Sequence, residues 1–318
     1  MTWNPLDLPD QTGRTHVVTG ATAGIGYFAA EQLAAAGARV VLAARSPGRL
    51  EAATASIRTQ VPDAEVQGVV VDLASRDSVA RAADELAALG RIDGVLLNGG
   101  AMSRWTARSA DGLPLTLATH VVANAGLTAR LLPALVASGT AERPGRIVHT
   151  SSGFVDRARH IPLRDPLRTP RLGIRAYTQA KAFTEVLAFE LDRRLRAHGL
   201  PVLSLVSRPG VGVDAKTPER AGVHDASTRD RPNPYTPWAQ GKDTAAWSAV
   251  RALTDPAAQG GELYAPEGGI AGAPVRIAPP AHTVRPDAGV AEQLWARVAE
   301  LAGVESPLVG VANPVRGA

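Results

Sequence analysis

The sequence predicts a doubly wound α/β fold, in which helices cover both faces of a parallel sheet, within a single domain. Short apolar segments alternate with helical patterns along most of the chain, and this order produces parallel sheets. The first apolar segment runs directly into a glycine-rich turn and a helix. With 318 residues and no linker-like run before its C-terminal third, the chain fits one large domain, residues 1–318.

The predicted strands are 15–19, 38–43, 65–71, 94–97, 146–150 and 201–207, and the predicted helices are 27–36, 75–89, 116–138 and 176–198. Parallel strands all end at one edge of a sheet, where such folds bind their ligands. Residues suited to ligand contact follow several strand ends, namely Asp72, Asn98, Ser151, Ser152 and the pair Pro209-Gly210. Two less regular segments complete the predicted domain, a substrate lid at 214–238 and an extension with a terminal helix at 266–318.

A glycine-rich turn follows the first strand, in the sequence GATAGIG. Gly20, Gly24 and Gly26 would let the backbone approach a pyrophosphate, and the following helix would offer unpaired amides and a positive dipole end. Their spacing, TGxxxGxG, differs from the general GxGxxG fingerprint. An ordinary glycine turn is the alternative, and the βαβ pattern that follows argues against it. We therefore expect a dinucleotide-binding Rossmann fold.

The end of the second strand selects the dinucleotide. A carboxylate about 20 residues beyond the glycines binds a ribose 2′-hydroxyl, whereas an arginine there accommodates a 2′-phosphate. The chain has Arg45 at this place and no carboxylate before Glu51. NADP is therefore the predicted cofactor, and NAD is disfavoured.

The stretch AYTQAK contains the candidate for proton transfer. Tyr177 and Lys181 are four residues apart, so on a helix they share one face. A free tyrosine has a pKa of about 10, and a neighbouring ammonium lowers that pKa by stabilising the phenolate. Lysine is rare in this chain, with only Lys181, Lys216 and Lys242 among 34 basic residues. We expect Lys181 to lower the pKa of Tyr177.

The composition argues against several classes of protein. The net charge is only +4, basic residues are scattered and 4% of residues are aromatic, so no nucleic-acid surface is indicated. The absence of cysteine excludes disulfides and thiolate chemistry, and no metal-ligand spacing is evident. The N-terminal residues 1–11 lack an apolar signal core, and no apolar run reaches membrane-spanning length by our count. We expect a cytoplasmic protein with a small-molecule substrate and without nucleic-acid or membrane partners. A homo-oligomer is left open.

These motifs together resemble the short-chain dehydrogenase/reductase family, and more narrowly its retinol-dehydrogenase-like branch. The stretches WNPLDLPDQTGRTHVVTGATAGIG, AYTQAKAFTEVLAFELDRRLRAHG and TDPAAQGGELYAPEGG carry the similarity. The resemblance implies catalytic roles for Ser152, Tyr177 and Lys181. It implies cofactor contacts for Gly20, Thr22, Gly24, Ile25, Gly26, Arg45, Asp72, Leu73, Asn98, Gly99, Tyr177, Lys181, Pro209 and Gly210.

The chain departs from the family pattern at several positions. Leu97 replaces the first asparagine of the family's NNAG motif, and Asp214 replaces the threonine that follows the Pro-Gly turn. Counting without gaps places His120 at the position of the family's catalytic asparagine, with Asn124 one turn later. His120 is a candidate for the proton route and can itself titrate, while a structural histidine is the alternative. Ala180, where many relatives have serine, is expected to be harmless.

The implied function is hydride transfer between NADPH and a ketone or aldehyde, or between NADP and a primary or secondary alcohol. Tyr177 would be the general acid or base and Ser152 a hydrogen-bond donor to the reacting oxygen. The irregular stretches 153–175, 214–238 and 265–286 would select the substrate, expected to be bulky and apolar. One alternative is a cofactor-binding sensor or scaffold without turnover. Another is a reductase of carbon–carbon double bonds, or a non-redox enzyme, on the same fold.

Overall fold

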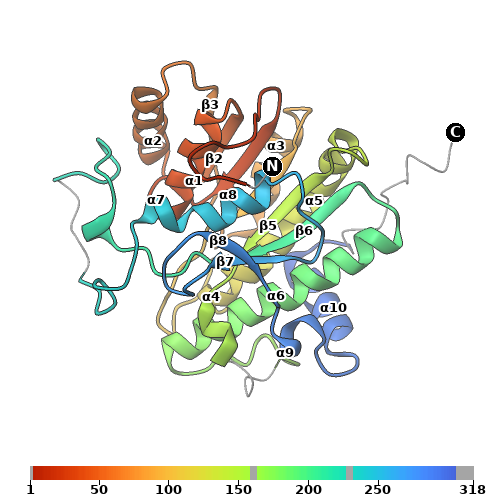
Figure 1. Ribbon diagram of the computed structural model, residues 1–318. Helices are drawn as coiled ribbons and strands as arrows, with labels where there is room; N and C mark the ends of the chain where they lie inside the picture. Colours follow the sequence, from red (N-terminus) through yellow and green to blue (C-terminus); the bar gives the residue numbers. More distant parts are fainter. Residues whose placement is uncertain (1–2, 158–162, 227–231, 306–318) are drawn as a thin grey trace, which may run out of the picture.

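The computed structural model describes residues 3–157, 163–226 and 232–305. Its strands form one eight-stranded sheet in the order β3-β2-β1-β4-β5-β6-β7-β8, which runs through the middle of the molecule (Figure 1). The strands are β1 Thr15–Thr19, β2 Arg39–Ala44, β3 Val66–Val70, β4 Gly94–Leu97, β5 Gly145–Thr150, β6 Val202–Ser207, β7 Leu263–Pro266 and β8 Pro274–Ile277. The predicted strands are thus confirmed with their bounds shifted by no more than a residue or two.

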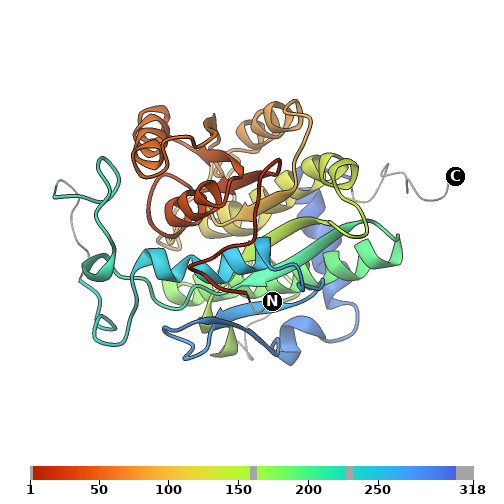
Figure 2. The same cartoon turned by 45° about the horizontal axis from the view of Figure 1, so that its top comes forward.

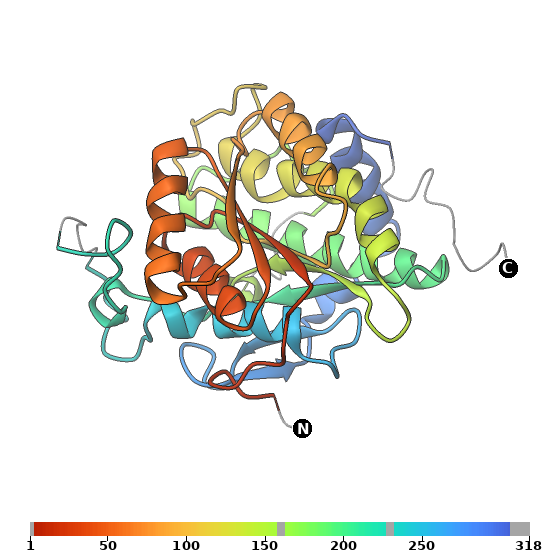
Figure 3. The ribbon, with the colours of Figure 1, turned by 90° about the horizontal axis from the view of Figure 1, so that it is seen from above.

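Helices cover both faces of this sheet (Figure 3). The α-helices are α1 Gly24–Ala35, α2 Pro47–Gln60, α3 Arg76–Ala87, α4 Leu115–Leu117, α5 Ala123–Ser138, α6 Gly173–Ala197, α7 Lys242–Ala245, α8 Trp247–Thr254, α9 Ala281–Val284 and α10 Val290–Ala302. Between them lie one π-helical turn, η1 Ala118–Val122, and two 3-10 turns, η2 Gly153–Arg157 and η3 Asp214–Lys216. Helices α1, α2 and α8 contribute to one apolar cluster and α3, α5, α6 and α10 to another.

The two clusters explain why the strands read as continuous apolar runs. Along β1, Val17 packs into the cluster that contains α3 and α5, and Val18 packs into the cluster that contains α1 and α8. Successive residues of a strand face opposite sides of the sheet, so a strand buried on both faces needs apolar residues at nearly every position. The doubly wound arrangement is therefore confirmed.

The parallel sheet is correctly predicted up to β6, whereas the sequence analysis identified neither β7 nor β8. Strand β7 continues the parallel sheet beside β6. Strand β8 runs antiparallel to β7, with Leu263 opposite Ile277. The connection between them spans only residues 267–273, which is too short for a crossover and allows only a hairpin. Helix α2 was also missed, although Ser46 caps its first turn and Pro47 begins it, which is a recognised start signal.

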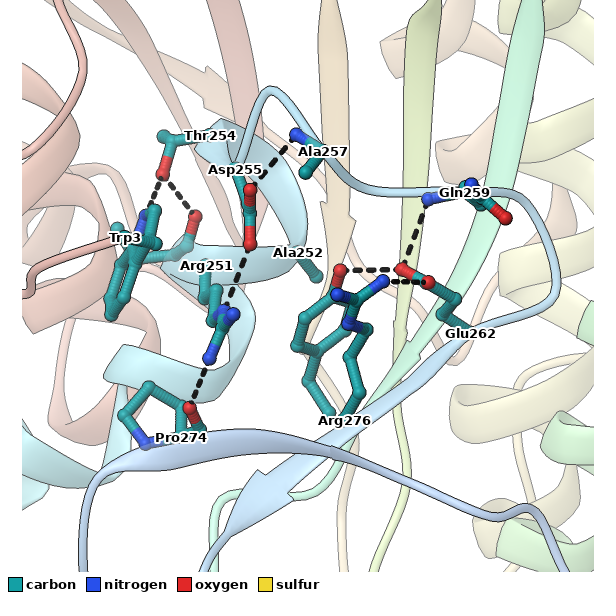
Figure 4. A network of polar contacts seen from close by, with 12 residues as sticks. Trp3, Arg251, Ala252, Thr254, Asp255, Ala257, Gln259, Glu262, Pro274 and Arg276 are labelled. Atoms are coloured by element: carbon teal, nitrogen blue, oxygen red, sulfur yellow. Dashed lines mark hydrogen bonds and ion pairs between the residues drawn. The ribbon is translucent and has the colours of Figure 1, made fainter. Parts of the chain in front are cut away.

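A network of polar contacts fastens this hairpin to α8 and to the N-terminal segment (Figure 4). Trp3 Nε1 donates to Thr254 Oγ1 at 2.9 Å. Arg251 joins the Asp255 carboxylate at 3.0 Å and the Pro274 carbonyl at the start of β8. Strand pairing places β7 and β8 in the sheet, and these side-chain contacts hold them there. The predicted extension 266–318 therefore begins within the sheet.

Helix α5 and the turns before it correct a further expectation. The segment Leu115–Ser138 is long and apolar enough to span a membrane by length and composition, whereas the sequence analysis counted no such run. Some 61% of its most apolar window is buried inside the protein, because α5 packs against α3, α10 and β5, and the turns before it pack against α6. Its apolar character is accounted for by this core position.

The predicted lid, 214–238, leaves the body of the molecule beside α7 and extends past the sheet edge (Figure 2). It begins with η3, continues as turns, and is joined to the core by a backbone bridge between Gly212 and Gln240. Residues 227–231 of the lid, 158–162 of the stretch 153–175 and 306–318 of the extension lie outside the described residues.

Candidate active site

The carboxyl ends of β1, β4, β5 and β6 meet at one edge of the sheet and carry the predicted site residues. Strand pairing sets Leu97 beside His149 and Thr150 beside Ser207, so Asn98, Ser151 and Arg208 follow neighbouring strand ends. Asn98 Nδ2 donates to the Thr19 carbonyl at 3.2 Å, which ties β4 to the glycine turn. The sheet therefore brings together residues that are far apart in the sequence.

The glycine turn has the shape of a phosphate-binding cradle. Gly20 has a φ of +68°, a conformation that side chains disfavour. A Cβ atom on Gly26 would lie 2.6 Å from the Gly20 carbonyl oxygen, so only glycine fits there. Helix α1 begins at Gly24 without a side-chain cap and without an acidic residue in its first turn. Its free amides and positive dipole end fit the pyrophosphate of a dinucleotide.

The predicted adenine end of the cofactor lies where β2 and β3 end. Arg45 is exposed immediately after β2, and Thr22, Ile25, Asp72 and Leu73 are half-buried. Leu73 also packs against Gly99, where a Cβ would lie 2.6 Å from Leu73 Cδ1.

The predicted nicotinamide end of the cofactor lies at the turn after β6. Gly210 has a φ of +69° and lies against the Ile270 carbonyl, while the Pro209 carbonyl accepts a hydrogen bond from Gln240.

Tyr177 and Lys181 lie on the first half of α6, as predicted. The Ser152 hydroxyl lies beside the Tyr177 phenol, where it stabilises the phenolate, and Lys181 Nζ lies 5.7 Å from the centre of the tyrosine ring. Lys181 is 3% exposed and donates to the Thr150 carbonyl at 2.6 Å. Burial lowers the pKa of Lys181 to about 7, partly offset by the nearby carboxylate of Glu185.

The expected lowering of the Tyr177 pKa is not found in this structure. Burial raises the pKa of Tyr177, and the hydrogen bond with Ser152 offsets part of that increase. The lysine is held by the Thr150 carbonyl, and its own ammonium is destabilised by burial. The tertiary environment therefore outweighs the charge interaction that the helical spacing predicted.

His120 lies in the π-helical turn η1, with its ring edge-on to Tyr177 at 5.5 Å between ring centres. The ring packs on Gly100, where a Cβ would lie 2.0 Å from His120 Cε1. Ala101 backbone approaches the ring, but neither ring nitrogen has a hydrogen bond of normal geometry in the described structure. Asn124 instead donates to the His120 carbonyl at 2.8 Å. His120, and not Asn124, therefore faces Tyr177.

The prediction that His120 can itself titrate near neutral pH is not supported by the environment of its ring. Burial, and then the charge of Lys181, hold the pKa of His120 well below its usual value. The imidazole is therefore neutral at physiological pH. A role in relaying or positioning remains compatible with this geometry, and a role as a cation does not.

A buried ion pair beside the site was not predicted. Glu185, one turn after Lys181 on α6, is fully buried and pairs with Arg208 at 2.8 Å. Its carboxylate also accepts hydrogen bonds from Ser151 Oγ at 2.6 Å and Thr283 Oγ1 at 2.9 Å. Ser151 is thereby committed to Glu185, and Ser152 is the serine that contacts Tyr177. An arginine immediately before Pro209-Gly210 was the available signal.

Lys242 is a second site residue that the prediction passed over. It begins α7, and its ammonium pairs with the Asp214 carboxylate. Its side chain runs along the glycine turn, where a Cβ on Gly24 would lie 3.6 Å from Lys242 Cδ. Asp214, noted as a departure from the family threonine, is therefore part of an ion pair at the cradle. The rarity of lysine in this chain was the signal that could have found it.

Exposed apolar side chains gather in segments next to the site. The chain around Ser103 lies against the start of α6, four residues before Tyr177, because the Ser103 carbonyl is 3.3 Å from a Cβ built on Gly173. Arg171 stacks over the Trp105 ring at 5.9 Å. The large exposed apolar residues of these segments and of the lid are Met102, Trp105, Phe154, Leu172, Ile174, Tyr235 and Trp238. No group of three potential metal ligands occurs within the described ranges.

Comparisons with known proteins agree with this geometry. A family model described as short chain dehydrogenase matches residues 14–215. The short chain dehydrogenase/reductase dpchH of Colletotrichum higginsianum is 32% identical over 317 residues, covering 92% of this chain and 76% of the relative. Polyprenol dehydrogenase of Mus musculus is 37% identical over 230 residues, covering 69% and 66%, respectively. The human dehydrogenase/reductase SDR family member 13 is 38% identical, covering 62% and 51%.

Solved structures show the same fold. A protein of Mycobacterium paratuberculosis described as uncharacterized has a TM-score of 0.76 and 29% identity, with 97% of this chain and 100% of that chain covered. A Shigella flexneri protein complexed with NADP has a TM-score of 0.60 and 23% identity, with 81% and 98% covered. Among the relatives, polyprenol dehydrogenase and SDR family member 13 also agree with the predicted resemblance to the retinol-dehydrogenase-like branch. The chain belongs to the short-chain dehydrogenase/reductase family.

Proposed function

We propose that this protein is an NADP-dependent oxidoreductase that interconverts a ketone or aldehyde and the corresponding alcohol, with Tyr177 as the general acid or base. One observation carries the proposal. The Ser152 hydroxyl lies beside the Tyr177 phenol and stabilises its phenolate, next to the buried Lys181 and at the sheet edge that also forms the glycine cradle. A proton donor, a second hydroxyl and a dinucleotide cradle are the parts that carbonyl reduction needs.

The roles of the side chains follow from their positions. The bound nicotinamide would supply or accept the hydride. Ser152 donates a hydrogen bond to the substrate oxygen, and Tyr177 gives that oxygen its proton in reduction or takes the proton in oxidation. Lys181, with a pKa of about 7, is poised to exchange a proton near neutral pH. Its contact with the Thr150 carbonyl holds it beside the tyrosine.

The preference for NADP is supported by Arg45. This side chain is exposed at the end of β2, where it would reach a 2′-phosphate on the adenine ribose. The Shigella flexneri neighbour is complexed with NADP, and at 23% identity that likeness supports the fold more than the cofactor. The glycine cradle would hold the pyrophosphate of either dinucleotide.

A bulky apolar substrate is supported by the exposed apolar side chains next to the site. Met102 and Leu172 are each more than half exposed, and large apolar residues left in water commonly mark binding surfaces. One relative carries the name polyprenol dehydrogenase, and a polyprenol is an apolar alcohol. Cytoplasmic location and any oligomeric state stay predictions from the sequence.

The test is NADPH consumption over a panel of aliphatic, aromatic and terpenoid ketones and aldehydes, repeated with NADH. We expect turnover with NADPH, and we expect Tyr177→Phe to lower kcat by about 10²- to 10⁴-fold, the usual contribution of a general acid. Tyr264→Phe, whose hydroxyl contacts Glu262 in the hairpin network, is the matched control and should keep the rate within about twofold.

Other results would select the alternatives. Unchanged turnover in Tyr177→Phe would overturn the tyrosine mechanism. Tight NADPH binding without turnover of any carbonyl or alcohol would favour a sensor or scaffold. Turnover confined to conjugated carbon–carbon double bonds would identify a different reductase on this fold.

A further inference from the structure

Lys242 is the cation that lies against the entrance of the glycine cradle. Its backbone N–H is bonded to Thr217 Oγ1 at 3.0 Å, which places the residue firmly at the start of α7. From there its side chain passes within van der Waals distance of the position a Gly24 side chain would occupy. The ammonium ends at Asp214, and the pair is only partly exposed, 27% for the lysine and 10% for the aspartate.

The other lysine of this segment is committed elsewhere. Lys216 Nζ donates to the carbonyls of Pro237 and Ala239 at 3.3 and 2.7 Å, so its ammonium is bound to backbone carbonyls at the end of the lid.

Helix α1 has an uncapped N-terminus at Gly24 with no acidic side chain in its first turn. A flexible cation beside such an end is placed to bind an anion together with the helix amides.

We propose that Lys242 binds the pyrophosphate of the dinucleotide, and that Asp214 holds this lysine in the cofactor-free protein and gives it up when cofactor binds. The proposal rests on the dinucleotide binding proposed above and adds a residue to it. A pyrophosphate brings two negative charges against the single charge of Asp214, so it is the stronger partner for one ammonium. The same charges would repel the aspartate.

Exchange of partners makes the two members of the pair act in opposite directions. Without Lys242 the pyrophosphate loses a cation, so cofactor binding weakens. Without the charge of Asp214 the lysine no longer has to leave a partner before it binds, and one anion near the phosphates disappears, so binding strengthens. A pair that only supported the fold would instead give weaker binding when either member is removed.

The experiment measures the dissociation constants of NADPH and of 2′-AMP, which lacks the pyrophosphate, by fluorescence and calorimetric titration. The proteins are wild type, Lys242→Met, Asp214→Asn and, as the matched control, Lys216→Met. We expect Lys242→Met to weaken NADPH binding by about tenfold or more, as for loss of a charged hydrogen bond, and to leave 2′-AMP binding unchanged. We expect Asp214→Asn to strengthen NADPH binding, and Lys216→Met to have little effect.

Several outcomes would overturn the proposal. Equal NADPH affinity in wild type and Lys242→Met would do so, as would a parallel loss of 2′-AMP binding, which signals general damage to the site. Weaker NADPH binding in Asp214→Asn would show a supporting pair and not an exchange. If wild type itself binds neither NADPH nor NADH, the proposed function fails first, whereas normal wild-type binding with an unaffected lysine variant overturns this inference alone.

Discussion

His120 fills the space between the Gly100 backbone and the edge of the Tyr177 ring. Its carbonyl is occupied by Asn124 and by Thr184 Oγ1 at 3.3 Å, so the π-helical turn that presents the ring is held by side chains from α5 and α6. Both ring nitrogens are buried without hydrogen bonds of normal geometry in the described structure. This combination favours a side chain that positions Tyr177 or relays a proton as a neutral group.

Replacing His120 tests this view. We expect His120→Ala to lower kcat by roughly tenfold, about 1.4 kcal/mol in the activation barrier, because Tyr177 loses the ring that bounds it. The Kd for NADPH should change much less, since the glycine cradle is untouched. The shape of the pH–rate profile between about pH 6 and 8 should be retained, because burial holds the pKa of His120 well below its usual value.

Steady-state kinetics and NADPH titration provide both readouts, with His16→Gln as a control because His16 is buried near the other end of β1. If His120→Ala leaves both kcat and the pH profile unchanged, the histidine is structural only. If NADPH binding falls as much as kcat, the side chain supports the cofactor site and not the chemistry.

At the scale of the element, α6 connects catalysis with stability. Its first turns carry Tyr177 and Lys181, and the next turn carries Glu185. Through Glu185 the helix holds Ser151 after β5, Arg208 after β6 and Thr283 in α9. One fully buried carboxylate therefore joins two strand ends to the C-terminal part of the chain.

We expect Glu185→Gln to lower the free energy of unfolding by about 3 kcal/mol or more, because it leaves the buried Arg208 without its buried counter-charge. The control uses the other partner of the same arginine. Asp156 pairs with Arg208 at 2.8 Å but is 60% exposed, so Asp156→Asn should cost no more than about 1 kcal/mol. Urea unfolding measures both, and equal losses would contradict a dominant role for the buried pair.

At the scale of the whole molecule, buried neutral histidines link stability to pH. Burial lowers the pKa of His16 and of His149 to about 3 each, whereas a histidine in the unfolded chain has a pKa of about 6.5. Between these values the unfolded chain binds protons that the folded protein does not. The contribution of these two histidines to the free energy of unfolding is therefore complete above about pH 6.5. It decreases as the pH falls toward 3.

Each such histidine contributes a slope of up to about 1.4 kcal/mol per pH unit. We expect wild type to lose stability between about pH 7 and pH 5, and His16→Gln to lose about 2 kcal/mol less over the same interval. Urea unfolding at the two pH values measures the difference, with His198→Gln as a surface control that should follow wild type. If the free energy of unfolding falls equally in His16→Gln and wild type between pH 7 and pH 5, His16 does not cause the loss of stability in acid.

Local patterns in the sequence were sufficient for the fold class and for the positions of the glycine turn and of the Tyr177 and Lys181 pair. Alternating apolar and helical segments predicted six strands and their parallel sheet, and the glycine spacing predicted the cradle at Gly20 and Gly26. Helical spacing placed Tyr177 and Lys181 on one face. These features depend on neighbours along the chain, so they can be inferred from residue order alone. The antiparallel β8 was missed because its partner strand and its short turn were not recognised.

Contacts between distant segments decided the rest. The family resemblance had already assigned catalysis to Ser152, and the structure adds that Glu185 binds the neighbouring Ser151. The pKa of Tyr177 is raised and that of His120 lowered because tertiary packing removes both from water, an effect that spacing cannot supply. Lys242 reaches the cradle from 218 residues beyond Gly24 (242 − 24). Charge, burial and partner choice at this site are properties of the folded surroundings, whereas the strand segments and the residues of the cradle could be inferred from the sequence.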